Sequence, residues 1–208
     1  MSDLEALLRQ GLAALEQDAT PAQIRKLLAF QRLLAKWNRV YNLTAIRRPE
    51  DMVKLHLLDS LTIFPFLRGQ RVLDVGTGAG LPGIPLAILD ESRQFILLDS
   101  NAKKTRFVTQ AAIELGLKHV QVENSRIEHF EPEQRFDLVL CRAFASLGDI
   151  VTSTRRLLAP GGTIAAQKGK VLAEELAGVA DEFETSTFPL CVPGVEAERH
   201  LIAITMRG

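Results

Sequence analysis

The sequence has few cysteines and no long apolar runs. Its two cysteines, Cys141 and Cys191, are too few for a disulfide framework and are not spaced as metal ligands. No apolar run approaches the length that crosses a membrane, and the N-terminus lacks the apolar core of a secretion signal. These absences predict a cytoplasmic protein that holds no metal ion and contacts no membrane.

The sequence also lacks an excess of charge of either sign, because 25 basic residues balance 25 acidic ones among 208. This balance argues against nucleic-acid binding through bulk charge, although it is compatible with a local basic face. We find no internal repeat and no low-complexity segment, and hydrophobic residues make up 47% of the chain. This is the composition of a globular protein, and the length suits one ordinary domain with an appendage.

One stretch, residues 71–83, organises the rest of the chain. It reads RVLDVGTGAGLPG, in which a short apolar strand precedes Gly76, Gly78 and Gly80. Because glycine has no Cβ atom, the backbone of this turn can approach a ligand closely. The apolar run 84–89 follows, and Pro82 stands where a first helical turn tolerates proline. The pattern predicts a strand, a glycine turn and a helix, as in the nucleotide and nucleoside sites of doubly wound folds.

Two acidic residues help to decide which cofactor the turn binds. Residues 78–83 satisfy the dinucleotide pattern G-x-G-x-x-G, which is weak evidence alone. Asp74 suits a ligand with positive charge and would repel a pyrophosphate, and Asp99 ends the next apolar strand, where a carboxylate binds ribose hydroxyls. S-adenosylmethionine carries a sulfonium and an amino group and no phosphate, so it fits both acids. Either residue alone is explained equally well as a cap, Asp74 of the turn and Asp99 of the next helix, but the pair at this spacing favours the cofactor.

Helix and strand patterns continue along the chain. Amphipathic helices are predicted over 2–17, from Pro21 onward and over 49–67, which together predict a helical cap over residues 1–68. Later strands are predicted over 94–98, 119–123, 136–141, 163–167, 183–190 and 200–206, and helices over 101–115, 147–158 and 171–182, with a turn at 160–162. This alternation predicts an α/β domain over residues 69–208, with a mainly parallel sheet.

Three further segments carry candidate site residues. Ligand contacts in α/β folds come from loops at the carboxyl ends of strands, so the loop 124–128 is predicted to reach an adenine. Arg142 directly follows a predicted strand and is placed on the substrate side. The connection 37–44 is rich in hydrogen-bonding groups, and loops of this kind often carry function. Asn42 is the candidate there for binding the substrate, with the alternative that Asn42 and Thr44 only cap helix ends.

Six segments together resemble one known family. They are Asn42-Leu43-Thr44, HLLDS at 56–60, DVGTGAGLPGIP at 74–85, LLDS at 97–100, Arg142-Ala143-Phe144-Ala145 and RHL at 199–201. In this order, and over nearly the whole chain, they are similar to the RsmG (GidB) family of bacterial small-subunit ribosomal RNA methyltransferases. The sequence departs at Ala79, where relatives often have proline; the departure concerns the rigidity of the turn and not its chemistry.

The resemblance implies a class I methyltransferase fold (Rossmann-like), with a seven-stranded sheet whose last strand is antiparallel. It also implies that a methyl group passes from S-adenosylmethionine to N7 of a guanine, with 16S ribosomal RNA or the small ribosomal subunit as partner. Matched position by position, the family's cofactor site falls on Gly76, Leu81, Ile127, Glu128 and Arg142. We expect the enzyme to be a monomer.

Methylation at N7 has its own requirements. The N7 lone pair lies in the ring plane and carries no proton, so transfer needs positioning and no general base. An arginine that bound N7 would block the reaction, so an arginine in the site is expected to address O6 or a phosphate. The candidates for RNA contacts are Arg126, Arg142, Lys168 and Arg199, with Arg142 positioning the substrate. His56 and Asp59 could form an acid–base pair, but we predict that they support the loop 42–44.

Two other classes of function use the same features. A nicotinamide-dependent oxidoreductase would use the same glycines, but no hydride-transfer constellation is visible beside the turn. A non-catalytic nucleotide-binding module would keep the fold without the reaction, yet both acids and the glycines are intact.

Overall fold

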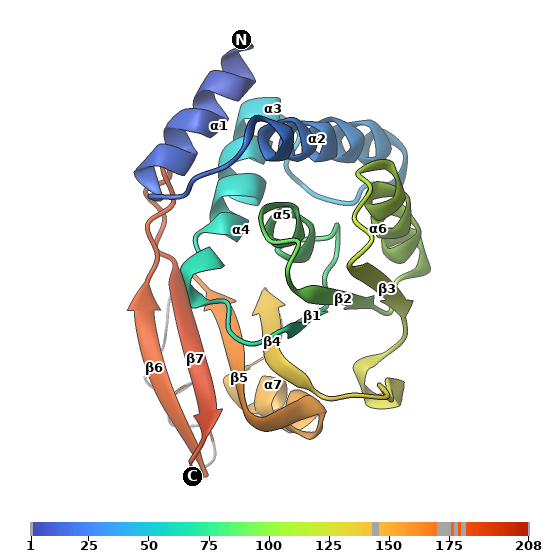
Figure 1. Cartoon of the computed structure of the whole chain (residues 1–208), viewed down its shortest axis with the longest axis vertical. Helices are drawn as coiled ribbons and strands as arrows, with labels where there is room; N and C mark the ends of the chain where they lie inside the picture. The colour runs from blue at the N-terminus through green and yellow to red at the C-terminus, as the bar shows by residue number, and fades with distance from the viewer. Residues whose placement is uncertain (1, 143–145, 170–175, 177–178, 180–181, 208) are drawn as a thin grey trace.

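The computed structural model describes residues 2–142, 146–169, 176, 179 and 182–207. A seven-stranded sheet in the order β3-β2-β1-β4-β5-β7-β6 forms its centre (Figure 1). The strands are β1 (Arg71–Val75), β2 (Gln94–Asp99), β3 (Val120–Asn124), β4 (Phe136–Arg142), β5 (Leu158–Lys168), β6 (Phe183–Pro189) and β7 (His200–Met206). Strands β1 to β5 are parallel, whereas β7 pairs antiparallel with both β5 and β6. The last strand is therefore antiparallel, as the resemblance implies.

The helices lie on both faces of this sheet. They are α1 (Asp3–Ala14), α2 (Pro21–Tyr41), α3 (Pro49–Met52), η1 (Val53–Leu58), α4 (Asp59–Leu61), α5 (Gly83–Leu89), α6 (Ala102–Glu114) and α7 (Leu147–Thr154), with short 3₁₀ turns η2 (Phe64–Phe66), η3 (Ile127–His129) and η4 (Arg155–Leu157). Helix α2 begins at Pro21, as predicted, with Thr20 and Gln23 forming a capping box. No helix in the described ranges is both long and apolar enough to cross a membrane.

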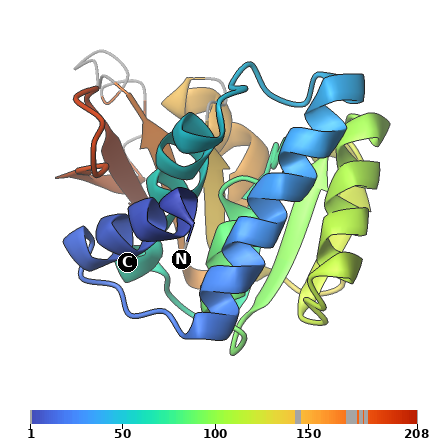
Figure 2. The same cartoon turned by 90° about the horizontal axis from the view of Figure 1, so that it is seen from above.

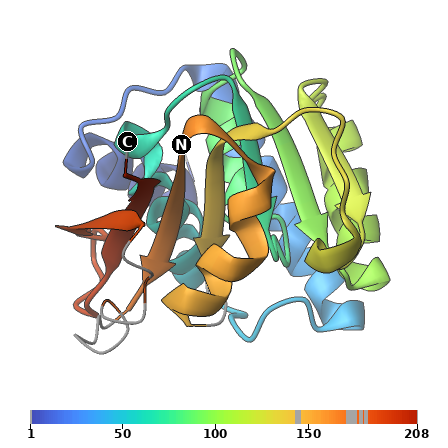
Figure 3. The same cartoon turned by 90° about the horizontal axis from the view of Figure 1, so that it is seen from below.

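The N-terminal helices share one core with the sheet. They lie on the same face as α5 and α6, while α7 lies on the opposite face (Figures 2 and 3). Leu8 and Phe30 from the helices belong to the same buried cluster as Val72 of β1 and Phe95 of β2. Leu73, the next residue of β1, belongs to the cluster under α7, because successive side chains of a strand point to opposite faces. The division of the chain at residue 68 stays a prediction.

The helix predicted over 49–67 is present, but its hydrogen-bond pattern changes along its length. Helix α3 continues into the π-helix η1 and then into α4, before the 3₁₀ turn η2. π-Helical turns are rare in proteins, and those that occur often lie at functional sites. Here the π-helix carries His56, and Asp59 is the first residue of α4.

The prediction of a turn at residues 160–162 is wrong, because these residues lie inside β5. Phe136 of β4 lies opposite Leu158, and Leu138 lies opposite Thr163, so β5 has extra residues that bulge out of the ladder. Gly161 has a φ angle of +75° at this bulge. Pro-Gly-Gly indicates a break in regular backbone, and a bulge satisfies that signal as well as a turn does.

The remaining predicted elements follow the structure closely. The bounds of β2, β3, β4, β6, β7 and α6 lie within about one residue of those predicted. Two predictions concern residues outside the described ranges: most of the helix predicted over 171–182, and residues 143–145 of the RAFA segment.

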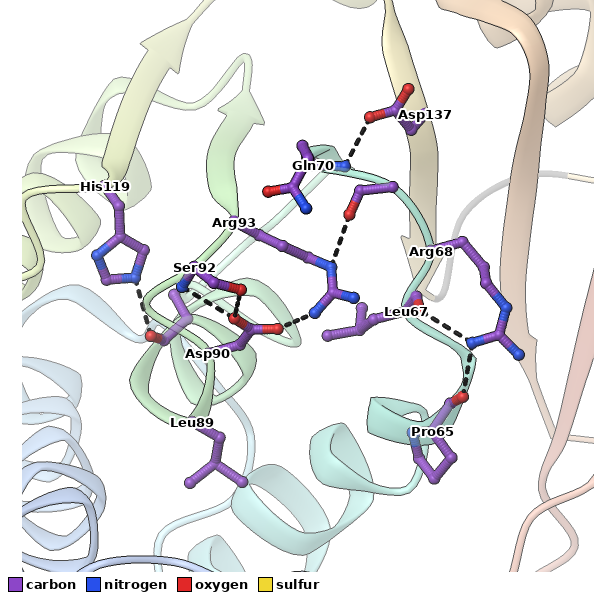
Figure 4. A network of polar contacts seen from close by, with 12 residues as sticks. Pro65, Leu67, Arg68, Gln70, Leu89, Asp90, Ser92, Arg93, His119 and Asp137 are labelled. Carbon is purple, nitrogen blue, oxygen red and sulfur yellow. Dashed lines mark hydrogen bonds and ion pairs between the residues drawn. The ribbon is translucent and has the colours of Figure 1, made fainter.

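A polar network fixes the chain where it passes from the N-terminal helices to β1 (Figure 4). The Nε of Arg93 donates to the carbonyl oxygen of Gly69 at 2.8 Å, and the backbone N–H of Gln70 donates to Asp137 Oδ2 at 2.7 Å. Arg93 also forms an ion pair with Asp90. Gly69 has a φ of +67°, and a Cβ there would lie 2.1 Å from the Cβ of Asp137. This network lies at the amino edge of the sheet, opposite the edge where the parallel strands end.

Candidate active site

The glycine turn begins where β1 ends, at the carboxyl edge of the sheet. Gly76, Gly78 and Gly80 have φ angles of +68°, +59° and +78°, a conformation that other residues rarely adopt. A Cβ on Gly80 would lie 2.7 Å from Cγ1 of Ile84. A Cβ on Gly78 would meet, among the described residues, only the Gly76 carbonyl oxygen at 3.8 Å. Gly80 therefore allows close packing inside the protein, while Gly78 borders space that a ligand can fill.

Asp74 lies fully buried beneath this turn. Its Oδ2 accepts hydrogen bonds from the Thr77 hydroxyl at 2.7 Å and from the N–H of Gly83, the first residue of α5, at 2.9 Å. The prediction that Pro82 stands in the first helical turn is wrong, because Pro82 is the N-cap residue that precedes α5. Within the part of the chain that is described, Oδ1 of Asp74 is buried without a partner. One oxygen therefore caps the turn, and the other is an acceptor that a donor from a cofactor would satisfy.

Asp99 braces the glycine turn from the end of β2. Its Oδ2 accepts the N–H of Gly78 at 2.9 Å, and its Oδ1 accepts the N–H of Asn101 at 2.8 Å. The side chain that caps α6 is Asn101 and not Asp99. Each carboxylate oxygen keeps a further lone pair, so Asp99 can still accept ribose hydroxyls. The two acids thus fit a cofactor that carries both cationic and hydroxyl groups.

The loop after β3 holds the residues that are predicted to reach the adenine. Ile127 is buried and its carbonyl oxygen accepts a hydrogen bond from Arg156 Nη2 at 2.6 Å, whereas Arg126 and Glu128 are exposed. Strands β2 and β1 separate β3 from β4. At a spacing of about 4.8 Å between strands, the end of β3 lies roughly 14 Å from the end of β4. Arg126 therefore does not join the other candidates for RNA contacts.

The other three candidates meet in one pocket. Arg142 ends β4, Lys168 ends β5 and Arg199 immediately precedes β7. Parallel β4 and β5 end at the same edge, where antiparallel β7 begins with His200 opposite Lys168. The pocket has a volume of about 370 Å³, and its other lining residues are Ile46, Leu55, His56, Asp59, Gln167 and Gly169.

A larger hollow of about 700 Å³ lies over β1 to β3, on the face of the sheet opposite the N-terminal helices. It is lined mainly by polar side chains, among them Arg71, Gln94 and Glu131. It includes neither the glycine turn nor its two acids, so we assign no chemistry to it.

Asp59 joins two of the cationic side chains in the pocket. Its Oδ2 accepts a hydrogen bond from Nη1 of Arg142 at 3.0 Å, and its Oδ1 accepts one from Nε of Arg199 at 3.1 Å. The prediction that Asp59 supports the loop 42–44 is wrong. The sequence gives no local signal for these ion pairs, because the partners lie 83 and 140 residues away.

His56 does support the loop, as predicted. Its Nδ1 lies 3.1 Å from the carbonyl oxygen of Leu55, which can only accept, so Nδ1 carries the proton. Its Nε2 therefore accepts a hydrogen bond from the hydroxyl of Thr44 at 2.9 Å. Burial, helped by the charge of Arg142, lowers the pKa of His56 to about 4. The ring is thus neutral near pH 7.

Asn38, which the sequence pattern did not single out, holds the same loop from α2. It is 2% exposed, its Oδ1 accepts the N–H of Thr44 at 2.9 Å, and its Nδ2 donates to the carbonyl oxygen of Ile46 at 3.3 Å. Asn42 is the left-handed C-cap residue of α2, and its side chain accepts a hydrogen bond from Arg47. The capping alternative is therefore confirmed for Asn42, and its contact with RNA stays a prediction.

The sheet order, together with the glycine turn and its two acids, defines a class I S-adenosylmethionine-dependent methyltransferase. Two solved structures share the fold. The glycopeptide N-methyltransferase MtfA, complexed with S-adenosyl-L-methionine, superposes with a TM-score of 0.60 at 12% identity, over 74% of this chain and 88% of its own. A putative O-methyltransferase from Klebsiella pneumoniae gives 0.60 at 15% identity, over 98% of this chain and 97% of its own.

The family follows from the sequence itself. Residues 23–202 match the family model described as rRNA small subunit methyltransferase G. A protein called ribosomal RNA small subunit methyltransferase G from Methylococcus capsulatus is 54% identical over 97% of this chain and 98% of its own length. The protein of that name from Nitrosococcus oceani is 47% identical over 98% and 95%. The chain belongs to the rRNA small subunit methyltransferase G family. This confirms the resemblance and leaves the oxidoreductase and the binding module without support.

Proposed function

We propose that the protein transfers a methyl group from S-adenosylmethionine to N7 of a guanine in 16S ribosomal RNA, either free or within the small subunit. The observation that carries the proposal is that a cofactor turn and a cationic pocket lie side by side. Val75, which ends β1 before the turn, pairs with Cys141, the residue before Arg142. Neighbouring strands lie about 4.8 Å apart, so the methyl donor and the target base would meet here.

Different residues around the turn would bind different parts of the cofactor. Asp99 would bind the ribose hydroxyls, the unpartnered Oδ1 of Asp74 would face the cationic amino-acid end, and Ile127 and Glu128 would border the adenine. Gly76, Gly78, Gly80 and Leu81 form the wall of the turn. The cofactor supplies an electrophilic methyl group, and the protein supplies its orientation.

The pocket suits an anionic substrate, and the described residues that line it offer no free proton acceptor. Arg142, Lys168 and Arg199 bring three cations to it against the single carboxylate of Asp59. Of its lining groups, Asp59 and His56 are the candidates for a general base. Both arginines engage Asp59, and both ring nitrogens of His56 are hydrogen-bonded, with a pKa of about 4. This supports attack by N7, which has no proton to lose, over attack by an exocyclic amine.

The proposal also includes that the enzyme is a monomer and that it acts in the cytoplasm.

Methylated RNA is expected to become cleavable by borohydride and aniline, because this chemistry detects methylation at ring N7 and leaves N2-methylguanine intact. The single-turnover rate of His56→Gln is expected to change modestly and to keep the pH dependence of the wild type, since His56 takes no proton in the transfer. Strand-scission mapping and stopped assays across pH measure these results. RNA incubated without cofactor is the control.

Two outcomes would contradict the proposed chemistry. One is a methyl group on an exocyclic nitrogen. The other is a basic limb in the pH profile of the wild type that disappears in His56→Gln.

Cofactor binding is expected to release a proton below about pH 6. Burial raises the pKa of Asp74 to about 6, so this carboxyl is largely protonated below that value in the free protein. A cationic cofactor favours the carboxylate and lowers the pKa, so the affinity rises as the pH increases toward about 6 and then levels off. Calorimetry at about pH 5.5 and about pH 7.5, in buffers of different ionisation heat, measures the released protons.

Asp74→Asn is the control, because an amide oxygen can still accept the hydrogen bonds from Thr77 and Gly83 but does not titrate. It should bind the cofactor without proton release at either pH. If the wild type released no proton at the lower pH, Asp74 would not face the cationic end of the cofactor.

A further inference from the structure

The main-chain carbonyl group of Asp59 accepts hydrogen bonds from two side chains. The Thr62 hydroxyl, at the C-cap of the same short helix, donates one at 2.7 Å. Nε2 of Gln167 on β5 donates the other at 3.1 Å. Residue 59 is therefore fixed against the sheet before its carboxylate is considered.

The carboxylate of Asp59 then divides its two oxygens between two arginines. Arg142 donates through Nη1 from the end of β4, and Arg199 donates through Nε from the residue immediately before β7. Two guanidinium groups repel each other at short range, and a carboxylate between them offsets that repulsion and fixes the distance between them. Asp59 thus determines where both cations lie.

The exposed fractions of the three side chains differ in a way that separates their roles. The side chain of Asp59 is 6% exposed, whereas those of Arg142 and Arg199 are 21% and 27% exposed. Asp59 borders the pocket, but its side chain is almost fully covered, whereas the two arginines are more exposed there. RNA that enters the pocket can therefore contact the arginines more readily, while Asp59 acts through them. In the described part of the chain, the guanidinium of Arg142 makes one hydrogen bond, which leaves further N–H groups for a ligand.

We propose that Asp59 is a positioning residue for methyl transfer, which holds Arg142 and Arg199 as a fixed pair of contacts to the target nucleotide. This inference rests on the proposed function. The arginines would bind acceptor atoms of that nucleotide, O6 or phosphate oxygen, and so aim N7 at the methyl group. A residue in this role affects the rate of the bound complex more than the binding of the cofactor.

The test compares Asp59→Asn with Asp90→Asn. Asp90 is a matched control, because its side chain is 10% exposed and is also paired with an arginine, Arg93, but at the amino edge of the sheet. Single-turnover methylation of small-subunit RNA, measured over a range of enzyme concentrations, separates the maximal rate from half-saturation. Asp59→Asn is expected to lower the maximal rate at least about ten-fold with cofactor affinity within about three-fold, and Asp90→Asn to change neither beyond about two-fold.

A double-mutant cycle tests whether Asp59 acts through the arginines. In an Arg199→Ala background, Asp59→Asn should cost clearly less than it costs in the wild type, because one of its two partners is already gone. A purely structural residue would instead give additive losses in activity that track the loss of folded protein. Additive losses, or equal activity of Asp59→Asn and Asp90→Asn, would overturn the proposal.

Two further measurements keep the test decisive. If Asp59→Asn does not fold, Arg199→Lys preserves the charge and removes the Nε contact, and it should lower the maximal rate with little change in stability. An unchanged rate in that variant would also overturn the proposal. The wild type is assayed in parallel: if it methylates no guanine in small-subunit RNA, then the proposed function fails, and not the role of Asp59.

Discussion

Arg142→Ala is expected to lower the single-turnover rate of methyl transfer by about 100-fold or more. Arg142 stands at the end of β4, beside the glycine turn, where a misplaced base loses its alignment with the methyl group. The free energy of unfolding should change much less than the activation free energy of methyl transfer. Asp59 keeps Arg199 as a partner, so the loss stays below the roughly 3–5 kcal/mol of a buried charge left unpaired.

The measurement pairs RNA methylation under excess enzyme with thermal unfolding of the same preparations. Arg142→Lys serves as the matched variant: it keeps the charge but loses the planar fork of donors, so it should recover only part of the activity. If activity fell only in proportion to the folded fraction, Arg142 would be a structural residue.

Asp99→Ala is expected to weaken S-adenosylmethionine binding by about 1.5–3 kcal/mol, or roughly 10- to 150-fold, because hydrogen bonds to a charged acceptor are lost. Calorimetry with S-adenosylmethionine and with its demethylated product measures the change. The wild type should not bind NAD, since the buried Asp74 lies beneath the turn where a pyrophosphate would sit.

Asp137→Ala controls for the loss of backbone bracing. Asp137, like Asp99, accepts two backbone N–H groups, at 2.7 and 2.9 Å, but it lies at the opposite edge of the sheet. Its replacement should leave cofactor affinity within about two-fold while affecting stability. Unchanged affinity in Asp99→Ala, or tight NAD binding by the wild type, would contradict the cofactor assignment.

The part of the site that sequence reasoning could predict is the part built from consecutive residues. The strand, the alternating glycines and Asp99 stand in fixed local order, and periodicity places them at the carboxyl edge of a parallel sheet. Most strand bounds were predicted closely for the same reason. The positive φ angles of Gly76, Gly78 and Gly80 agree with the glycine pattern.

What sequence reasoning missed depends on contacts between distant segments. Asp59 lies on a helix, where a spacing of three residues suggests a partnership with His56, but its carboxylate binds one arginine at the end of β4 and another just before β7. Asn38 looks like any polar residue near a helix end until the loop folds back on it. The π-helix and the bulge in β5 are likewise adjustments of regular elements to their packing.

The strand order has a consequence for the growing polypeptide. Strand β7 lies between β5 and β6, although it is synthesised after both, so β6 has no neighbour to pair with until β7 has been made. Arg199 immediately precedes β7 and reaches Asp59 only when that strand inserts. A nascent chain emerges close to ribosomal RNA, which is the very class of molecule it is proposed to modify. Until β7 inserts, that chain lacks one arginine of the pair, so the proposed RNA contact is completed at the same step that closes the sheet.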